Sequence, residues 1–243
     1  MNSEANSSSP PPLSHVAAIL AALMFPSLLT FTYFVVLSHR SPGLQQGTYA
    51  LGKCIQFAFP LFWAVFVLKE RLWKKRVRTS GILPGFLFGA VVSVAMLLLY
   101  HLVLRPSGFF ADATPAIQAK ISGLGLDSAW QFIALAIFYA AVHSVLEEYY
   151  WRWFVFRQLR RCTPLGIAIL ISSLGFMAHH VILLASYFGW TSPVTYVFSC
   201  GVAIGGAVWA FLYEYSGSLL GPWLSHALID AAIFTVGYDL APF

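Results

Sequence analysis

Residues 82–104 read ILPGFLFGAVVSVAMLLLYHLVL, a run that contains no Asp, Glu, Lys or Arg. A helix needs about 20 mostly apolar residues to cross the hydrocarbon core of a bilayer, and this run is long enough. The strands of a membrane barrel alternate polar and apolar residues, whereas residues 90–99 do not alternate. The run therefore predicts a transmembrane α-helix.

The composition of the whole chain supports this interpretation. Of the 243 residues, 59% are hydrophobic and 9% are charged, and the mean hydropathy is +0.75. Soluble domains carry about a quarter charged residues, so this chain cannot cover a water-facing surface. We expect an integral membrane protein.

Further apolar runs of span length lie at 16–38, 48–68, 128–156, 165–187, 192–213 and 218–237. Together with 82–104 they predict an all-α fold, a polytopic transmembrane helical bundle of about seven spans. We expect a single transmembrane domain at 13–243, with a motif-bearing core at about 128–237. Residues 1–12, rich in Ser and Pro, should form a disordered tail. The tail lacks the basic region of a cleaved signal peptide, so the first helix is expected to be retained.

Basic residues gather in two of the predicted connections. The group after the second span comprises Lys69, Arg71, Lys74, Lys75, Arg76 and Arg78, and the group after the fourth comprises Arg157, Arg160 and Arg161. Alternating spans place both groups on one side of the membrane, which the positive-inside rule makes cytoplasmic. The N-terminus would then be cytoplasmic, and the size of the chain favours a bacterial inner membrane. Membrane orientation accounts for the net charge of +5, so no nucleic-acid partner is expected.

Ionisable residues inside the predicted spans or at their edges point to a functional site. A charge at the bilayer centre costs about 2.5–3.5 kcal/mol, so these residues must pair, face the protein interior or line a wet cavity. They are His101, His143, Glu147, Glu148, Arg152, His179, His180, Glu214, His226 and Asp230.

The span at 128–156 carries two adjacent glutamates. Residues four apart share a helix face, which places His143 over Glu147 and Glu148 over Arg152. Glu148 therefore has a cation for a structural ion pair. Glu147 has none on its own helix, which makes it the candidate general base. The residues alone leave open that both glutamates only join helices through ion pairs.

Two later spans add further polar groups. Phe176 and His180 share a helix face, whereas His179 points elsewhere, and His226 lies over Asp230. A single intramembrane histidine more often forms an interhelical hydrogen bond than takes part in catalysis. Three helices that each supply an acid or a histidine favour a common site.

The three segments together resemble the CPBP family of intramembrane proteases, which includes the type II CAAX prenyl endopeptidases. The family motifs are E-E-x-x-x-R, F-x-x-x-H and H-x-x-x-N/D. They occur here in that order, as EEYYWR at 147–152, FMAHH at 176–180 and HALID at 226–230. The resemblance covers about residues 130–237.

This resemblance implies a hydrolase that cuts peptide bonds in or near the membrane. Glu147 would activate the attacking water, and His180 would help to position that water. His226 and Asp230 would form the oxyanion site. An ionised Asp cannot donate a hydrogen bond to an oxyanion, so Asp230, at a position that is often Asn, must be protonated or must orient His226.

The resemblance makes Glu148 and Arg152 the structural ion pair that helix spacing also suggests. His179 has no counterpart in the motif, and it is a supporting candidate around the catalytic residues, together with His143 and Phe176. The expected partners are a membrane-associated protein or peptide substrate and the lipid bilayer.

We expect no cofactor and no metal, because the resemblance favours a glutamate-dependent mechanism and the helix with the glutamates lacks H-E-x-x-H. Zinc held by Glu147, His180 and His226 is the alternative. The cysteines have no C-x-x-C spacing, which excludes a thiolate zinc site and a disulfide scaffold.

Two other functions compete with proteolysis. Chains of Glu, Asp and His also form proton relays, so a proton-coupled transporter is one alternative. A non-catalytic scaffold, such as an immunity-type protein, is the other.

The sequence also predicts one helix contact. The spacing of Gly201 and Gly205 predicts a close helix contact in the sixth span.

Overall fold

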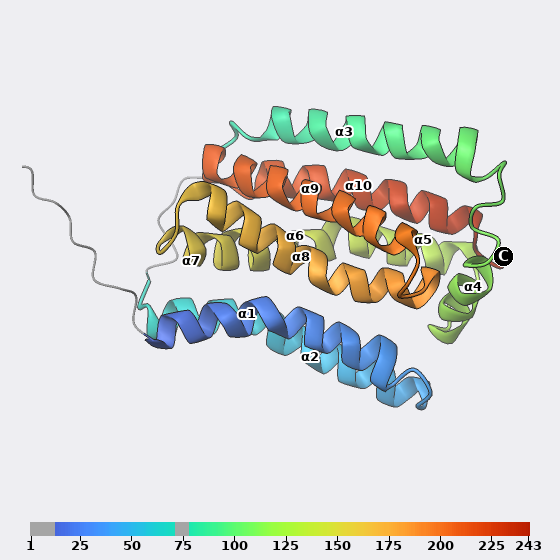
Figure 1. The fold of residues 1–243 in the computed structure, drawn as a ribbon, viewed down its shortest axis with the longest axis horizontal. Helices are drawn as coiled ribbons and strands as arrows, with labels where there is room; N and C mark the ends of the chain where they lie inside the picture. Colours follow the sequence, from blue (N-terminus) through green and yellow to red (C-terminus); the bar gives the residue numbers. More distant parts are fainter. Residues whose placement is uncertain (1–12, 71–77) are drawn as a thin grey trace, which may run out of the picture.

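The computed structural model describes residues 13–70 and 78–243, and in that part of the chain every regular element is helical (Figure 1). Three N-terminal helices each continue into a π-helical turn: α1 (Leu13–Phe31, then Thr32–Val36), α2 (Pro42–Phe62, then Trp63–Val67) and α3 (Ile82–Leu99, then Tyr100–Leu104). The short helix α4 spans Thr114–Gly123. The next span joins α5 (Ala129–Ile137), a π-helical turn (Phe138–His143), α6 (Ser144–Glu148), a second π-helical turn (Tyr149–Phe156) and α7 (Arg157–Arg160). Three long helices follow: α8 (Leu165–Phe188), α9 (Pro193–Ser216) and α10 (Leu220–Asp239).

The prediction of an all-α membrane bundle is confirmed. Within the described residues, six helices are long and apolar enough to cross a membrane, one fewer than the predicted number. Although α10 is 20 residues long, it is not among the six, because His226 and Asp230 lower its hydropathy. The predicted range 82–104 coincides with the observed helix Ile82–Leu104. The predicted tail at 1–12 lies outside the described residues, as do Arg71, Lys74, Lys75 and Arg76.

The helices run side by side along one direction (Figure 1). α1 and α2 form a hairpin on one side of the bundle, α3 lies next to α10 on the opposite side, and α5–α9 lie between them. The end of α2 and the turn between α7 and α8 lie at the same end, whereas α4 and the C-terminus lie at the other. Glu70, just after α2, forms ion pairs with both Arg157 and Arg161. Lys69, the described residue next to Glu70, therefore lies at the same end of the bundle as the second basic group, as alternating spans predict.

The surface of the bundle is apolar, and ionisable side chains are buried inside it among apolar ones, whereas a soluble protein exposes most of its charges. Leu102 and Val91 are 71% and 66% exposed, whereas Glu148 and Arg152 are 0% and 2% exposed. Ionisable residues within a membrane face the protein interior. This distribution fits a bilayer as the surrounding solvent.

Glycines bring α3 and α10 into close contact. A Cβ on Gly85 would collide with the carbonyl group of Gly221, and one on Gly89 would lie 2.8 Å from the Cα of Ser225. Small residues four apart let two helix backbones approach in this way.

The predicted close contact at Gly201 and Gly205 is wrong. In the described part of the chain nothing lies within 4 Å of a Cβ built on Gly201, and the one on Gly205 meets Trp209 of its own helix. The spacing identifies a helix face with small residues, but it does not show whether another helix packs against that face. Gly206, on the adjacent face, packs against Arg152 and Phe176 instead.

Candidate active site

The two adjacent glutamates lie in α6, at the centre of the bundle. The residues that follow, Tyr150, Trp151 and Phe154, are each 1% exposed, so the helix is surrounded by protein here. π-Helical turns precede and follow α6. Such turns insert an extra residue into a helix and often occur at functional sites, because they change which way the flanking side chains point.

Glu148 makes direct hydrogen bonds to two side chains. Its Oε1 accepts a hydrogen bond of 3.0 Å from Nη1 of Arg152, the residue that helix spacing places beside it, and it lies 2.8 Å from Nδ1 of His226 on α10. Arg152 also donates to the carbonyl oxygen of Gly206 at 3.2 Å, and its guanidinium lies over the rings of Phe176 and Trp209. One oxygen of this fully buried carboxylate is thus held by two short contacts.

Glu147 is surrounded by basic groups at longer distances. Its nearest basic atoms come from four separate segments: Nε2 of His143, His179 and His226, each at 3.8 Å, and Nζ of Lys53 at 4.0 Å. Direct N–H···O hydrogen bonds measure about 2.7–3.2 Å, so none of these contacts is a direct bond. Polar groups at such separations are readily bridged by a water molecule. The side chain is only 5% exposed, so such a water would be enclosed by protein.

The two oxygens of Glu147 face different groups. Oε1 lies towards Lys53, His143 and His179, whereas Oε2 lies towards His226. His226 Nε2 is also 3.6 Å from Oδ1 of Asp230, one turn further along α10. The Oε2 side of the carboxylate therefore faces the histidine and the acid of the third motif.

Trp209 fixes the plane of the His226 ring. The two rings are stacked, with centroids 4.2 Å apart and an angle of 13° between their planes. Trp209 is held in turn by a hydrogen bond of 2.9 Å from its Nε1 to Oγ of Ser225. The His226 ring thus lies between an aromatic face and two carboxylates.

The two histidines of α8 occupy different positions. His179 stacks on Trp151, with 4° between the ring planes, and contacts Glu147. His180 donates from Nδ1 to the carbonyl oxygen of Phe176 at 2.9 Å, and its ring lies 4.2 Å from that of His179. In the described residues there is no hydrogen bond or ion pair between His180 and Glu147. The family resemblance pointed to His180, and His179, which has no counterpart in the motif, was only a supporting candidate.

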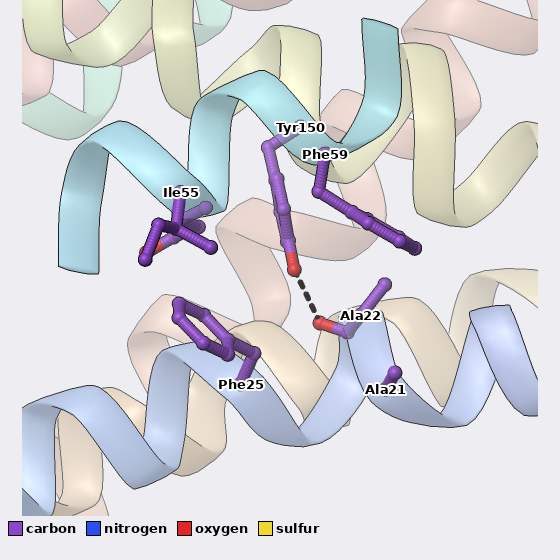
Figure 2. A pocket seen from close by; sticks show the side chains of 7 residues that line it. Ala21, Ala22, Phe25, Ile55, Phe59 and Tyr150 are labelled. Carbon is purple, nitrogen blue, oxygen red and sulfur yellow. Dashed lines mark hydrogen bonds between the residues drawn. The ribbon is translucent and has the colours of Figure 1, made fainter. Parts of the chain in front are cut away.

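Tyr150 connects this centre to the N-terminal hairpin. Its hydroxyl donates a hydrogen bond of 2.7 Å to the carbonyl oxygen of Ala22 on α1 (Figure 2). The ring lines a cavity of about 80 Å³ between α1 and α2, together with Phe25, Ile55 and Phe59. The contact anchors α1 against the helix that carries both glutamates.

Comparison with known families agrees with this geometry. Residues 129–232 match the family model described as Type II CAAX prenyl endopeptidase Rce1-like. The segment matched by this model is called the Rce1-like domain below. The match begins at the first residue of α5 and ends within α10, so it contains every residue of the three motifs. No curated protein and no solved structure matches the chain significantly.

Lys53 contributes to the site from outside the Rce1-like domain, and it was missing from the sequence-based candidates. The predicted second span begins at 48, which places Lys53 near a membrane interface, where a lysine is unremarkable. The helix α2 instead begins at Pro42, so Lys53 lies well inside it. Its charge within an otherwise uncharged span was the available signal.

Zinc held by Glu147, His180 and His226 is the alternative to a metal-free site. Across the described ranges, no group of three or more His, Cys, Asp and Glu side chains is placed to hold a metal ion. The mechanism proposed below therefore contains no step that involves a metal.

Proposed function

We propose that the chain is an intramembrane endopeptidase in which Glu147 activates the attacking water. One observation carries the proposal. The Glu147 carboxylate lies at the centre of an Rce1-like domain and faces basic nitrogens from four segments, all at distances that a water molecule can bridge. The neighbouring Glu148, held by direct bonds, has a structural role with Arg152.

In this mechanism the Oε2 atom of Glu147 accepts a proton from water, and the water oxygen forms a bond to the scissile carbonyl carbon. His226 stabilises the oxyanion as a donor, and Asp230, 3.6 Å from its Nε2, orients that histidine. The tetrahedral intermediate then collapses, the C–N bond breaks, and protonated Glu147 delivers its proton to the leaving amine. The products are a carboxylic acid and an amine.

The histidines of α8 have complementary roles. His179, stacked on Trp151, holds Oε1 of Glu147. His180, whose Nδ1 is bound to a backbone carbonyl, uses Nε2 to position the attacking water. His143, which lies four residues before Glu147 on the same span, contacts the same oxygen as His179.

The substrate is a membrane-associated protein or peptide. Arg157 and Arg161 of the second basic group pair with Glu70, beside Lys69 of the first group, and the positive-inside rule makes that end of the bundle cytoplasmic. We propose a bacterial inner membrane with a cytoplasmic N-terminus.

The proposal is tested with purified protein in liposomes and a library of fluorogenic membrane-anchored peptides. A positioned general base contributes about 10²–10⁴-fold to the rate, so E147Q should lose that factor and remain folded. H180A should also lose cleavage, and H179A tests the contact with Oε1. His101→Ala is the matched control, because His101 is an exposed histidine at the end of the third span.

The outcomes separate the competing functions. Cleavage that is lost in E147Q and survives a strong chelator supports the proposal. Cleavage lost on chelation and restored by zinc overturns the metal-free mechanism. A folded wild type that cleaves nothing, with a proton flux that E147Q abolishes, indicates a transporter instead. E147Q with unchanged behaviour in both assays indicates a scaffold.

A further inference from the structure

A lysine from the N-terminal half of the chain reaches the Rce1-like domain. Nζ of Lys53, on α2, lies 4.0 Å from Oε1 of Glu147, and its side chain is 14% exposed. The ammonium group also lies 5.5 Å from the ring centre of Tyr49 and 5.4 Å from that of Phe57. Aromatic faces at this range attract a cation, so the amine is held in place by its own helix.

The two glutamates are served by separate cations. Arg152 is committed to Glu148 and to the carbonyl of Gly206. The remaining neighbours of Glu147 are His143 on the π-helical turn before α6, His179 on α8 and His226 on α10. Within the described ranges, Lys53 is thus the one Lys or Arg in ion-pair contact with Glu147.

The position of Lys53 defines which oxygen can react. Lys53 faces Oε1, whereas Oε2 faces His226. A cation on Oε1 favours the ionised carboxylate and turns the other oxygen towards the oxyanion side. These are the two requirements for a general base at this position.

We propose that Lys53 is a positioning residue for Glu147, which it keeps ionised and oriented. This inference rests on the proposed function. It implies that the Rce1-like domain at 129–232 is not a complete active site, because α2 supplies the counter-charge of its base. The hydrogen bond from Tyr150 to Ala22 holds the α1–α2 hairpin in the required position.

The first test compares Lys53→Met and Lys53→Arg with the wild type in liposomes, on a fluorogenic membrane-anchored peptide that the wild type cleaves. Misplacing a reacting group by about 1 Å can cost about 10²-fold in rate. We expect Lys53→Met to show that loss in kcat with little change in KM, and Lys53→Arg to recover most of it. Loss in KM alone would indicate substrate binding and overturn the proposal.

Lys120→Met is the matched control. Lys120 is also partly buried beneath aromatic rings, 3.9 Å from the ring centre of Tyr33, but it lies on α4 at one end of the bundle. The same substitution there should leave kcat unchanged. If both lysine variants lose activity equally, a general packing effect explains the loss and the proposal fails.

A second measurement does not require turnover. Infrared difference spectra between each protein and its E147Q counterpart isolate the Glu147 carboxyl group. At neutral pH the wild type and Lys53→Arg should show carboxylate bands, whereas Lys53→Met should show the carbonyl stretch of a protonated acid. Carboxylate bands in folded Lys53→Met would overturn the proposal and leave the protease function intact, whereas inactivity of folded wild type would count against the protease function alone.

Discussion

Glu147 and Glu148 are adjacent in sequence and have opposite surroundings. Oε1 of Glu148 makes contacts of 2.8 and 3.0 Å with His226 and Arg152. The nearest basic nitrogens around Glu147 lie at 3.8–4.0 Å. Consecutive helix residues point about 100° apart, so one carboxylate faces a closed ion pair and the other a wider polar space. We therefore assign a structural role to Glu148 and the proposed role of general base to Glu147.

This difference separates stability from activity. Breaking a buried, directly bonded pair leaves an uncompensated charge in a dry interior, which is costly. Removing the charge of Glu147 breaks no direct hydrogen bond and leaves several histidines that can lose their protons. Variants of the two positions should therefore fail in different assays.

The largest effect is expected for Glu148→Gln. This change removes a charge that is 0% exposed and paired with Arg152, and breaking such a pair costs about 3–5 kcal/mol. Thermal and denaturant unfolding in detergent should show the loss, while Glu147→Gln should unfold near the wild-type midpoint. Equal destabilisation of the two variants would contradict the comparison.

A double variant sharpens this test. Apolar replacement of both partners of a buried ion pair is often neutral, so Glu148→Leu with Arg152→Met should recover stability that either single change loses. Failure to recover would show that His226 and Gly206, which also contact the pair, account for most of the cost.

The next largest effect concerns His226, which contacts both glutamates. An oxyanion donor contributes about 10²–10³-fold to the rate, so His226→Ala should lose that factor. His226→Gln can still donate to Glu148, and it should keep more stability than His226→Ala without regaining activity. Equal activity of His226→Gln and wild type would place the oxyanion site elsewhere.

Much of the bundle follows from the sequence, because apolar run length and four-residue spacing are local properties of a helix. The range 82–104 coincides with an observed helix. Contacts within a helix are equally local: His143 with Glu147, and His226 with Asp230, lie where the spacing puts them.

Contacts between helices could not be predicted in the same way. They depend on how each helix is rotated, and the π-helical turns Phe138–His143 and Tyr149–Phe156 change that rotation around the glutamates. His179, which has no counterpart in the family motif, was only a supporting candidate, although it contacts Glu147. The predicted second span begins at 48, whereas α2 begins at Pro42. The predicted start places Lys53 near the membrane interface, where a lysine gives no signal of a functional site.

A smaller effect is expected where α3 supports α10, the helix that carries His226. A Cβ on Gly85 would meet the backbone of Gly221, whereas one on Gly201 has open space among the described residues. Overpacking costs about 1–3 kcal/mol, so Gly85→Ala should lower the unfolding midpoint. Gly201→Ala is the matched control and should be neutral or slightly stabilising, since alanine favours helix over glycine.

The smallest effect lies at the end of α2, where Glu70 pairs with Arg157 and Arg161. Burial alone would raise the pKa of Glu70, but the hydrogen bonds and charges of the two arginines outweigh it and lower the pKa below the usual 4.5. A carboxyl group with a lowered folded-state pKa stabilises the protein above its unfolded value, and this contribution is lost as pH falls through the folded value.

Glu70→Gln should therefore be less stable than the wild type at pH 7, by no more than about 1 kcal/mol because the pair is partly solvated. The difference should vanish as pH falls below 4.5, and unfolding midpoints of the two proteins across a pH series measure it. A difference that persists at low pH would mean that packing, not charge, holds this end of α2. Because α2 also carries Lys53, a charge-dependent contact here would connect the ion pairs at this end of the bundle to the surroundings of Glu147 and leave the directly bonded pair at Glu148 unaffected.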